Sequence, residues 1–120
     1  MRVTTTSEQW FSVPEAAEAL GVAQRDVRNM LADQRLVAIR RGESRALSIS
    51  SLAFVEDQGR VVVLPSLRGT LTSLSDAGYD DEESWRWLTA ANEELGERPI
   101  DALRAGRVHV VRRIAATLAF

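Results

Sequence analysis

The side chains best suited to chemistry in this sequence gather on one predicted helix, residues 23–33. Its apolar stripe is predicted at Ala23, Val27, Met30 and Leu31. Gln24 lies at the flank of the opposite face, which carries Arg25, Arg28 and Asn29. Arginine can donate two hydrogen bonds to guanine, and asparagine or glutamine can pair with adenine in the same bidentate way. An ordinary solvated helix face carries the same residue types. Residue types alone therefore favour neither a helix that reads DNA bases nor a solvated surface helix.

Three further arginines surround a predicted turn later in the chain. Arg40, Arg41 and Arg45 lie around the turn between two strand-like runs, residues 36–40 and 45–49. Because guanidinium groups crowded around one turn repel each other unless an anion is near, this cluster favours contact with phosphates or a minor groove. A hairpin with ordinary exposed arginines is the less favoured alternative.

A capped helix is predicted directly before the arginine-bearing one, at residues 13–20. Ser12 and Glu15 fit a capping box, Pro14 falls in the first turn, and Gly21 can end the helix in a left-handed conformation. Two helices joined by a short glycine-centred turn and followed by a hairpin have the order of a winged helix-turn-helix domain. This order favours insertion of the second helix in a major groove, with the hairpin as a wing on the backbone or minor groove.

The middle of the chain is predicted to connect two units. Residues 50–55 indicate a short helix, and the polar, glycine-containing segment 56–60 is the best candidate for a junction. Residues 61–64 predict a buried strand or an extended connector that stops at Pro65.

The C-terminal half predicts a series of short helices. The first ends at Gly78, and the acidic run 80–83 opens the next. There Asp80 can cap the helix, and the carboxylates favour the positive end of its dipole. A metal site or an acidic decoy for a basic partner is the less favoured interpretation of this run.

Two tryptophans supply most of the bulk of the C-terminal half. Trp85 shares a face with Leu88, whereas Trp87 points elsewhere, either onto the N-terminal half or toward a partner. Two more helices are predicted to begin at Pro99 and Val108. Since each half has only about 60 residues, neither core would be large, and we expect the two halves to pack together.

Charge is segregated along the chain, although the net charge of the 120 residues is only −2. All 15 basic residues are arginines. Residues 24–48 hold six arginines against three acidic residues, and residues 98–120 hold five arginines against one. Residues 74–97 hold eight acidic residues against one arginine. The first basic block coincides with the predicted second helix and wing, which is consistent with a polyanionic partner.

Several function classes lack support in the sequence. There is no cysteine, the single histidine, His109, lies in an apolar run, and the glycines are scattered singly. We therefore expect no enzyme activity, no cofactor and no metal site. The first eight residues lack the apolar core of a signal peptide, and no apolar run approaches the roughly 20 residues of a membrane span. A cytoplasmic protein is expected.

Two resemblances extend this interpretation. Residues 11–22, 27–28 and 35–38 resemble MerR- and excisionase-type winged helix domains. The arrangement of residues 10–120 resembles a family of small actinobacterial winged helix-turn-helix DNA-binding proteins, typified by a mycobacterial substrate of serine/threonine kinase L. The C-terminal part of this second resemblance is carried by residues 67–72, 76–78, 85–88, 98–103 and 119–120.

The family resemblance implies binding to double-stranded DNA, association with the nucleoid and control by a serine/threonine kinase. Under such control, Thr4, Thr5 and Thr6 would be the phosphoacceptors, placed in a tail without packing signals. Ala23 departs from the Ser or Thr that usually caps the recognition helix in such domains. We therefore expect the start of that helix to fray or to be capped by Gln24.

These observations predict a mainly α protein with a small β-hairpin wing, in which a helical C-terminal domain packs on the winged helix-turn-helix. The predicted parts are a flexible tail at residues 1–9, a DNA-binding domain at 10–56 and the helical domain at 61–120. The predicted function is that of a DNA-binding transcriptional regulator. The alternative is an antitoxin-like module, because residues 87–103 are similar to antitoxin C-terminal domains that self-associate or bind a protein partner.

Overall fold

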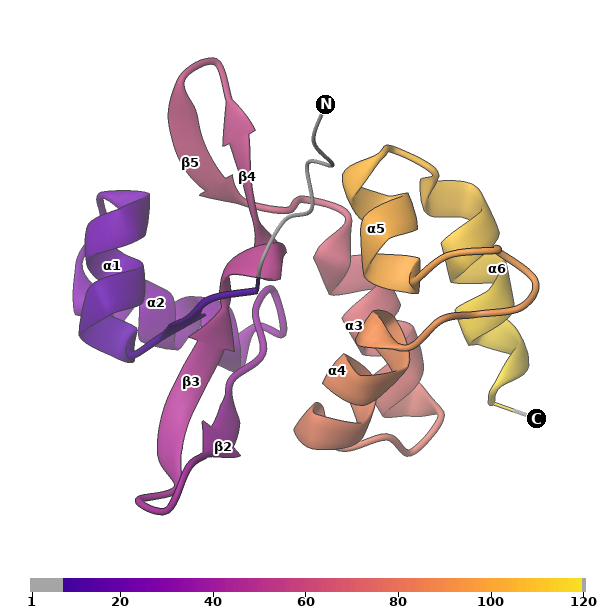
Figure 1. Ribbon diagram of the computed structural model, residues 1–120, viewed down its shortest axis with the longest axis horizontal. Coiled ribbons are helices and arrows are strands. Elements are labelled where there is room, and N and C mark those ends of the chain that lie inside the picture. The colour runs from indigo at the N-terminus through magenta and orange to yellow at the C-terminus, as the bar shows by residue number, and fades with distance from the viewer. Residues whose placement is uncertain (1–7, 120) are drawn as a thin grey trace, which may run out of the picture.

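The structure, a computed structural model, describes residues 8–119. Figure 1 shows two lobes, with α1, α2 and the strands on one side and the remaining helices on the other. The elements are β1 (Trp10–Phe11), α1 (Val13–Leu20), α2 (Gln24–Ala32), β2 (Ile39–Arg41), β3 (Ala46–Ser50), the 3-10 turn η1 (Ser51–Ala53), β4 (Phe54–Asp57), β5 (Arg60–Val63), α3 (Leu67–Asp76), α4 (Asp81–Thr89), α5 (Pro99–Arg104) and α6 (Val108–Thr117). This order confirms the predicted fold class.

The predicted caps of α1 are present at both ends. The hydroxyl of Ser12 accepts a hydrogen bond from the Glu15 amide at 3.2 Å, and the Glu15 carboxylate accepts one from the Ser12 amide at 2.8 Å. Gly21 ends the helix with φ of 71°, a left-handed conformation that costs glycine little. Local sequence thus determines where α1 begins and ends.

The wing is shorter than predicted and has a third strand. β2 begins at Ile39 rather than at Leu36, because Leu36 and Val37 turn inward and are buried in the core. β3 lies between β2 and β1, and both neighbours are antiparallel to it. Arg45, predicted as the first residue of the second strand, lies in the turn instead, with φ of 55°.

A second hairpin occupies the segment predicted as a junction. Phe54 and Val55, predicted as helical, belong to β4, which pairs with β5. The turn between them, Gln58 and Gly59, has positive φ at both residues (53° and 80°), the backbone geometry of a tight hairpin turn. Val61 in β5 is 38% exposed, so the strand predicted at 61–64 forms but is not fully buried.

The helices of the C-terminal half begin and end close to their predicted signals. Asp80 caps α4 by accepting a hydrogen bond from the Glu83 amide at 2.8 Å, and Gly78 precedes it with φ of 95°. Trp85 and Leu88 are buried on one face of α4, as predicted. Trp87 is half-buried against the rim of the core.

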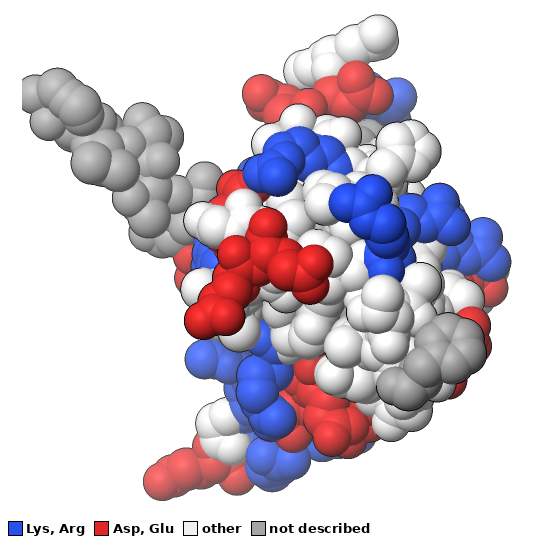
Figure 2. Space-filling view, turned by 90° about the vertical axis from the view of Figure 1, so that its right-hand side faces the viewer, with Lys and Arg blue, Asp and Glu red and all other residues white. Residues whose placement is uncertain are grey.

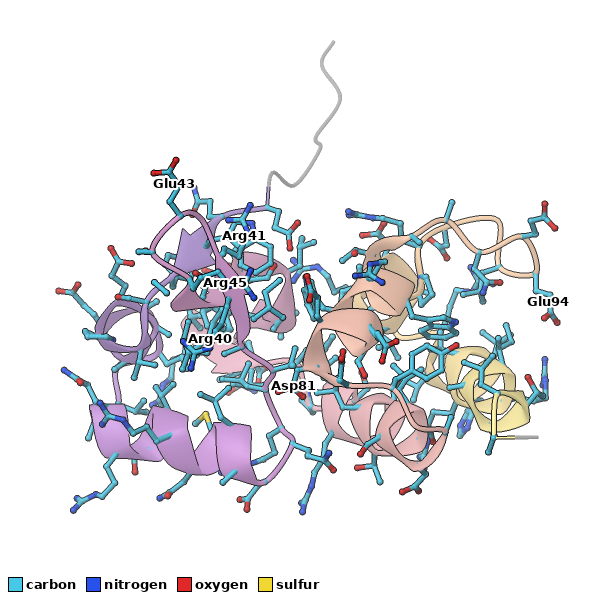
Figure 3. All side chains as sticks on the ribbon, turned by 90° about the horizontal axis from the view of Figure 1, so that it is seen from below. Arg40, Arg41, Glu43, Arg45, Asp81 and Glu94 are labelled. Atoms are coloured by element: carbon cyan, nitrogen blue, oxygen red, sulfur yellow. The ribbon has the colours of Figure 1, made fainter. Side chains whose placement is uncertain are left out.

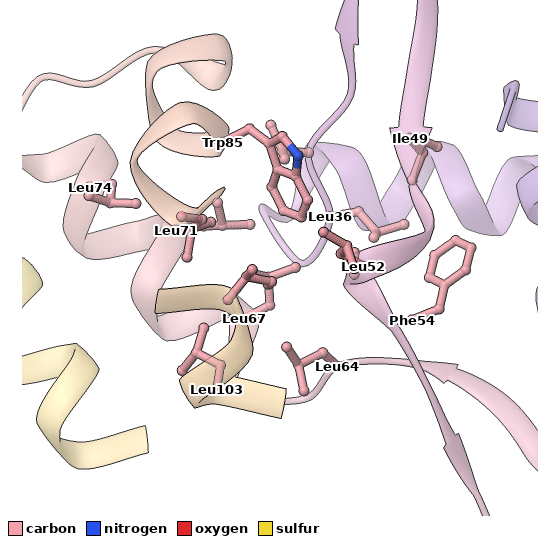
Figure 4. Close-up of a cluster of buried hydrophobic side chains, with 14 of the residues drawn as sticks. Leu36, Ile49, Leu52, Phe54, Leu64, Leu67, Leu71, Leu74, Trp85 and Leu103 are labelled. Carbon is pink, nitrogen blue, oxygen red and sulfur yellow. The ribbon is translucent and has the colours of Figure 1, made fainter. Parts of the chain in front are cut away.

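One hydrophobic core joins the two halves of the chain. Leu36, Ile49 and Leu52 of the N-terminal half belong to the same buried cluster as Leu67 and Trp85 of the C-terminal half. Figure 4 shows Leu67 between the side chains of the two halves. The prediction that the halves pack together is therefore confirmed.

The start of the described chain is tied to both halves. The carboxylate of Glu8 accepts hydrogen bonds from the Ser50 hydroxyl at 2.5 Å and from Trp85 Nε1 at 2.9 Å. The Gln9 amide donates to the Ser51 hydroxyl at 2.8 Å. Glu8 and Gln9, which the sequence predicts as part of a flexible tail at residues 1–9, are instead hydrogen-bonded to the folded domain. The predicted phosphoacceptors at residues 4–6 lie outside the described residues.

Candidate nucleic-acid interface

The outer face of α2 presents the four predicted recognition residues to solvent. Gln24, Arg25, Arg28 and Asn29 are all exposed, whereas Val27 on the reverse face is fully buried. Arg28 Nη2 donates a hydrogen bond to Gln24 Oε1 at 3.4 Å, one turn earlier on the same helix. The helix therefore displays guanidinium and amide groups together on one open surface.

The start of α2 differs from the prediction in two ways. Ala23 is exposed as the residue before the first turn, not buried in the apolar stripe, and it offers no side-chain cap. Gln24 does not replace the missing cap, since its amide oxygen is bonded to Arg28. Instead the carboxylate of Asp26 accepts a hydrogen bond from the Ala23 amide at 3.1 Å, which is one half of a capping box.

Replacing Ala23 with serine should complete this capping box. The new hydroxyl can accept from the Asp26 amide, so we expect the free energy of unfolding to rise by about 1 kcal/mol. Urea unfolding followed by circular dichroism measures the change. The matched control is Ala32→Ser at the other end of α2, which adds the same hydroxyl without an amide to cap. Equal effects of the two substitutions would contradict the capping account.

The wing separates its arginines onto two faces. Successive residues of a strand point to opposite faces, and Arg40, which pairs with Leu47, precedes Arg41 in β2. In Figure 3 Arg40 lies on the side of the hairpin nearer α2, and Arg41 lies on the far side. Arg40 therefore shares the α2 side of the domain, and Arg41 does not.

The guanidinium groups of Arg40 and Arg41 each have a local partner. The guanidinium carbon of Arg41 lies 4.1 Å from the centre of the Trp10 ring, a cation–π contact. Arg40 Nη1 donates to the carbonyl oxygen of Arg45 at 3.0 Å. Trp10 was not predicted as part of the site, although two aromatic residues just before the capping serine of α1 are a signal for a short added strand. Because Arg40 and Arg41 contact groups of the protein itself, repulsion among the wing arginines is not evidence for a bound anion.

No cluster of metal-ligating side chains occurs among residues 8–119, and none of the helices described there is long and apolar enough to cross a membrane.

The candidate interface consists of α2 and the wing: four residues on one helix face, and three arginines on a hairpin.

Comparison with known proteins places this surface in a family. Residues 2–47 match the model of the DNA-binding protein Rv2175c, wHTH domain, and residues 64–119 match the Rv2175c C-terminal domain of unknown function. The DNA-binding protein Rv2175c of Mycobacterium tuberculosis is 34% identical to this chain, over 98% of the chain and 86% of the relative. The chain belongs to the Rv2175c family.

The solved structure of Rv2175c supports the same assignment. This NMR structure matches all of the present chain and 87% of its own with a TM-score of 0.80 at 33% identity. The family predicted from the sequence is thereby confirmed. All seven predicted interface residues fall within the segment matched by the Rv2175c winged helix-turn-helix model. The C-terminal match is to the same family, so the comparisons do not favour the antitoxin-like alternative.

Proposed function

We propose that this protein binds double-stranded DNA through α2 and the wing and acts as a transcriptional regulator. The observation that carries the proposal is the exposed row of Gln24, Arg25, Arg28 and Asn29 on the second helix of a winged helix-turn-helix. A helix of this kind fits the major groove, where guanidinium and amide groups can read base edges.

The contacts of the interface suggest different roles for its residues. Arg28 and Asn29 lie mid-helix, and the hydrogen bond that Arg28 donates to Gln24 orients Arg28 along the helix. Arg40 lies on the α2 side of the wing and suits the adjacent backbone or minor groove. Arg41 and Arg45 suit phosphates farther along the duplex.

We further propose that the protein acts by binding rather than by catalysis, in the cytoplasm and on the nucleoid. Residues 10–56 would form the DNA-binding unit, and residues 61–120 a helical unit open to self-association or a protein partner. The similarity of residues 11–22, 27–28 and 35–38 to MerR-type domains belongs to this proposal as well.

A fluorescence titration of labelled duplex at several salt concentrations tests the proposal. We expect the logarithm of the binding constant to fall linearly with the logarithm of salt concentration, with a slope of about −0.9 per phosphate contacted. Sequencing of genomic fragments captured by the protein would identify preferred sites. Absence of binding at low salt, or binding that ignores salt, would overturn the proposal.

Kinase control of Thr4, Thr5 and Thr6 is part of the same proposal. Thr6 precedes Trp10 by four residues, and the Trp10 ring carries Arg41. A phosphate adds about −1.5 to −2 charges and would repel DNA phosphates. We expect aspartate at Thr4, Thr5 and Thr6 together to weaken duplex binding several-fold at low salt. The control is asparagine at the same positions, and equal affinities of the two triple variants would contradict this mechanism.

A further inference from the structure

A groove of about 390 Å³ separates the wing from the N-terminal end of α4. One wall belongs to the wing and the other to the C-terminal half. The wall residues are Ala38, Ile39, Arg40, Arg45 and Leu47 on the wing, and Asp80, Asp81 and Glu82 at α4. Figure 2 shows arginines and carboxylates close together low on the molecule, at the height of the wing and α4. Two arginines of the proposed DNA interface thus share a groove with three carboxylates.

The opposite charges in this groove do not form close ion pairs. Among residues 8–119, no ion pair within 4.0 Å joins Arg40 or Arg45 to a carboxylate. Burial raises the pKa of the Asp81 carboxyl above its usual value, and the neighbouring charge of Asp80 adds to the rise. A guanidinium close enough to neutralise Asp81 would act in the opposite direction. Among the described residues, Asp81 and Glu82 thus line the groove without a close ion pair to the wing arginines.

The carboxylates at this end of α4 divide into two pairs by their contacts. Asp80 and Glu83 are engaged in the capping box, through hydrogen bonds of 2.8 and 2.9 Å. Asp81 and Glu82 take no part in it, and Glu82 reaches only Arg86, at 4.0 Å. Asp81 and Glu82 can therefore be neutralised without altering the side chains that cap α4.

We propose that Asp81 and Glu82 limit the affinity of the DNA interface by repelling phosphates bound at Arg40 and Arg45. This inference rests on the proposed function. A duplex backbone bound at the wing would face the two carboxylates across this groove and would be repelled by them at ordinary salt concentrations. The C-terminal domain would thus influence how tightly the winged helix-turn-helix binds DNA without needing to contact the DNA itself.

Neutralising the two carboxylates tests the proposal. For the double variant Asp81→Asn, Glu82→Gln we expect about three- to tenfold tighter duplex binding at about 0.05 M salt, and a smaller gain at about 0.3 M salt. The matched control is Glu93→Gln, Glu94→Gln, which changes the net charge equally. Figure 3 shows Glu94 at the far end of the C-terminal half from the wing. We expect this control to change affinity less than twofold.

A second comparison locates the effect at the wing. In an Arg40→Ala, Arg45→Ala background the gain from neutralising Asp81 and Glu82 should largely disappear, because groups that act on a common partner are not additive. Thermal unfolding of each variant checks that α4 is intact, and the single substitutions Asp81→Asn and Glu82→Gln are measured separately in case the pair unfolds the helix.

The outcomes separate this inference from the proposed function. Equal gains for the groove variant and the Glu93, Glu94 control would show that net charge alone acts, and would overturn the inference. No gain in either variant would overturn it too. If the wild-type protein binds no duplex, or if Arg28→Ala leaves binding unchanged, the proposed function itself fails.

Discussion

Replacing Leu67 with alanine is expected to lower the free energy of unfolding by about 2–5 kcal/mol. The Leu67 side chain is 0% exposed and lies in the core between the two halves. Its removal leaves a cavity in the shared core. Closing this cavity would require α3 to move relative to the N-terminal half and to the other C-terminal helices. Urea unfolding followed by tryptophan fluorescence measures the loss, and we expect one cooperative transition, because the halves share this core.

The control for this prediction is Leu47→Ala, which removes the same atoms from an exposed position. Leu47 is 40% exposed on the wing, so its truncation should change the free energy of unfolding by less than about 0.5 kcal/mol. Two separate transitions in the wild-type protein, or similar effects of the two substitutions, would contradict the account of a single shared core.

The double variant Arg28→Ala, Arg40→Ala is expected to bind duplex DNA at least about tenfold more weakly than the wild type. If both residues contact phosphates, the slope of the logarithm of the binding constant against the logarithm of salt concentration should become shallower by about 2. Both side chains are exposed, one on the α2 face and one on the α2 side of the wing. Titrations at several salt concentrations measure both quantities, and stability should change little.

The control removes one exposed arginine far from the interface. Arg113 lies on α6, in the lobe opposite α2, and Arg113→Ala should leave both the affinity and the slope nearly unchanged. A loss of sequence preference in Arg28→Ala with little change of slope would assign Arg28 to a base edge. Unchanged affinity in the double variant would exclude α2 and the wing as the DNA-binding surface.

Local signals were enough to predict the elements that present the interface. The capping box at Ser12 and the left-handed Gly21 fix α1, and the apolar period around Val27 fixes which face of α2 is exposed. Asp80 fixes the start of α4 in the same way. Each of these signals acts between residues only a few positions apart, so it can be read from the sequence before any tertiary contact is known.

The sequence by itself determined α1, α2 and α4, the presence of a wing though not its exact bounds, and the exposed arginine and amide face of α2. Tertiary structure alone decided that Arg41 stacks on the Trp10 ring and that the Glu8 carboxylate accepts hydrogen bonds from both Ser50 and Trp85. It also decided that Asp81 shares a groove with the wing. Helical caps and periods depend on near neighbours along the chain, whereas these contacts join residues about 30 to 80 positions apart. Which charges face one another is therefore set by the packing of the two halves.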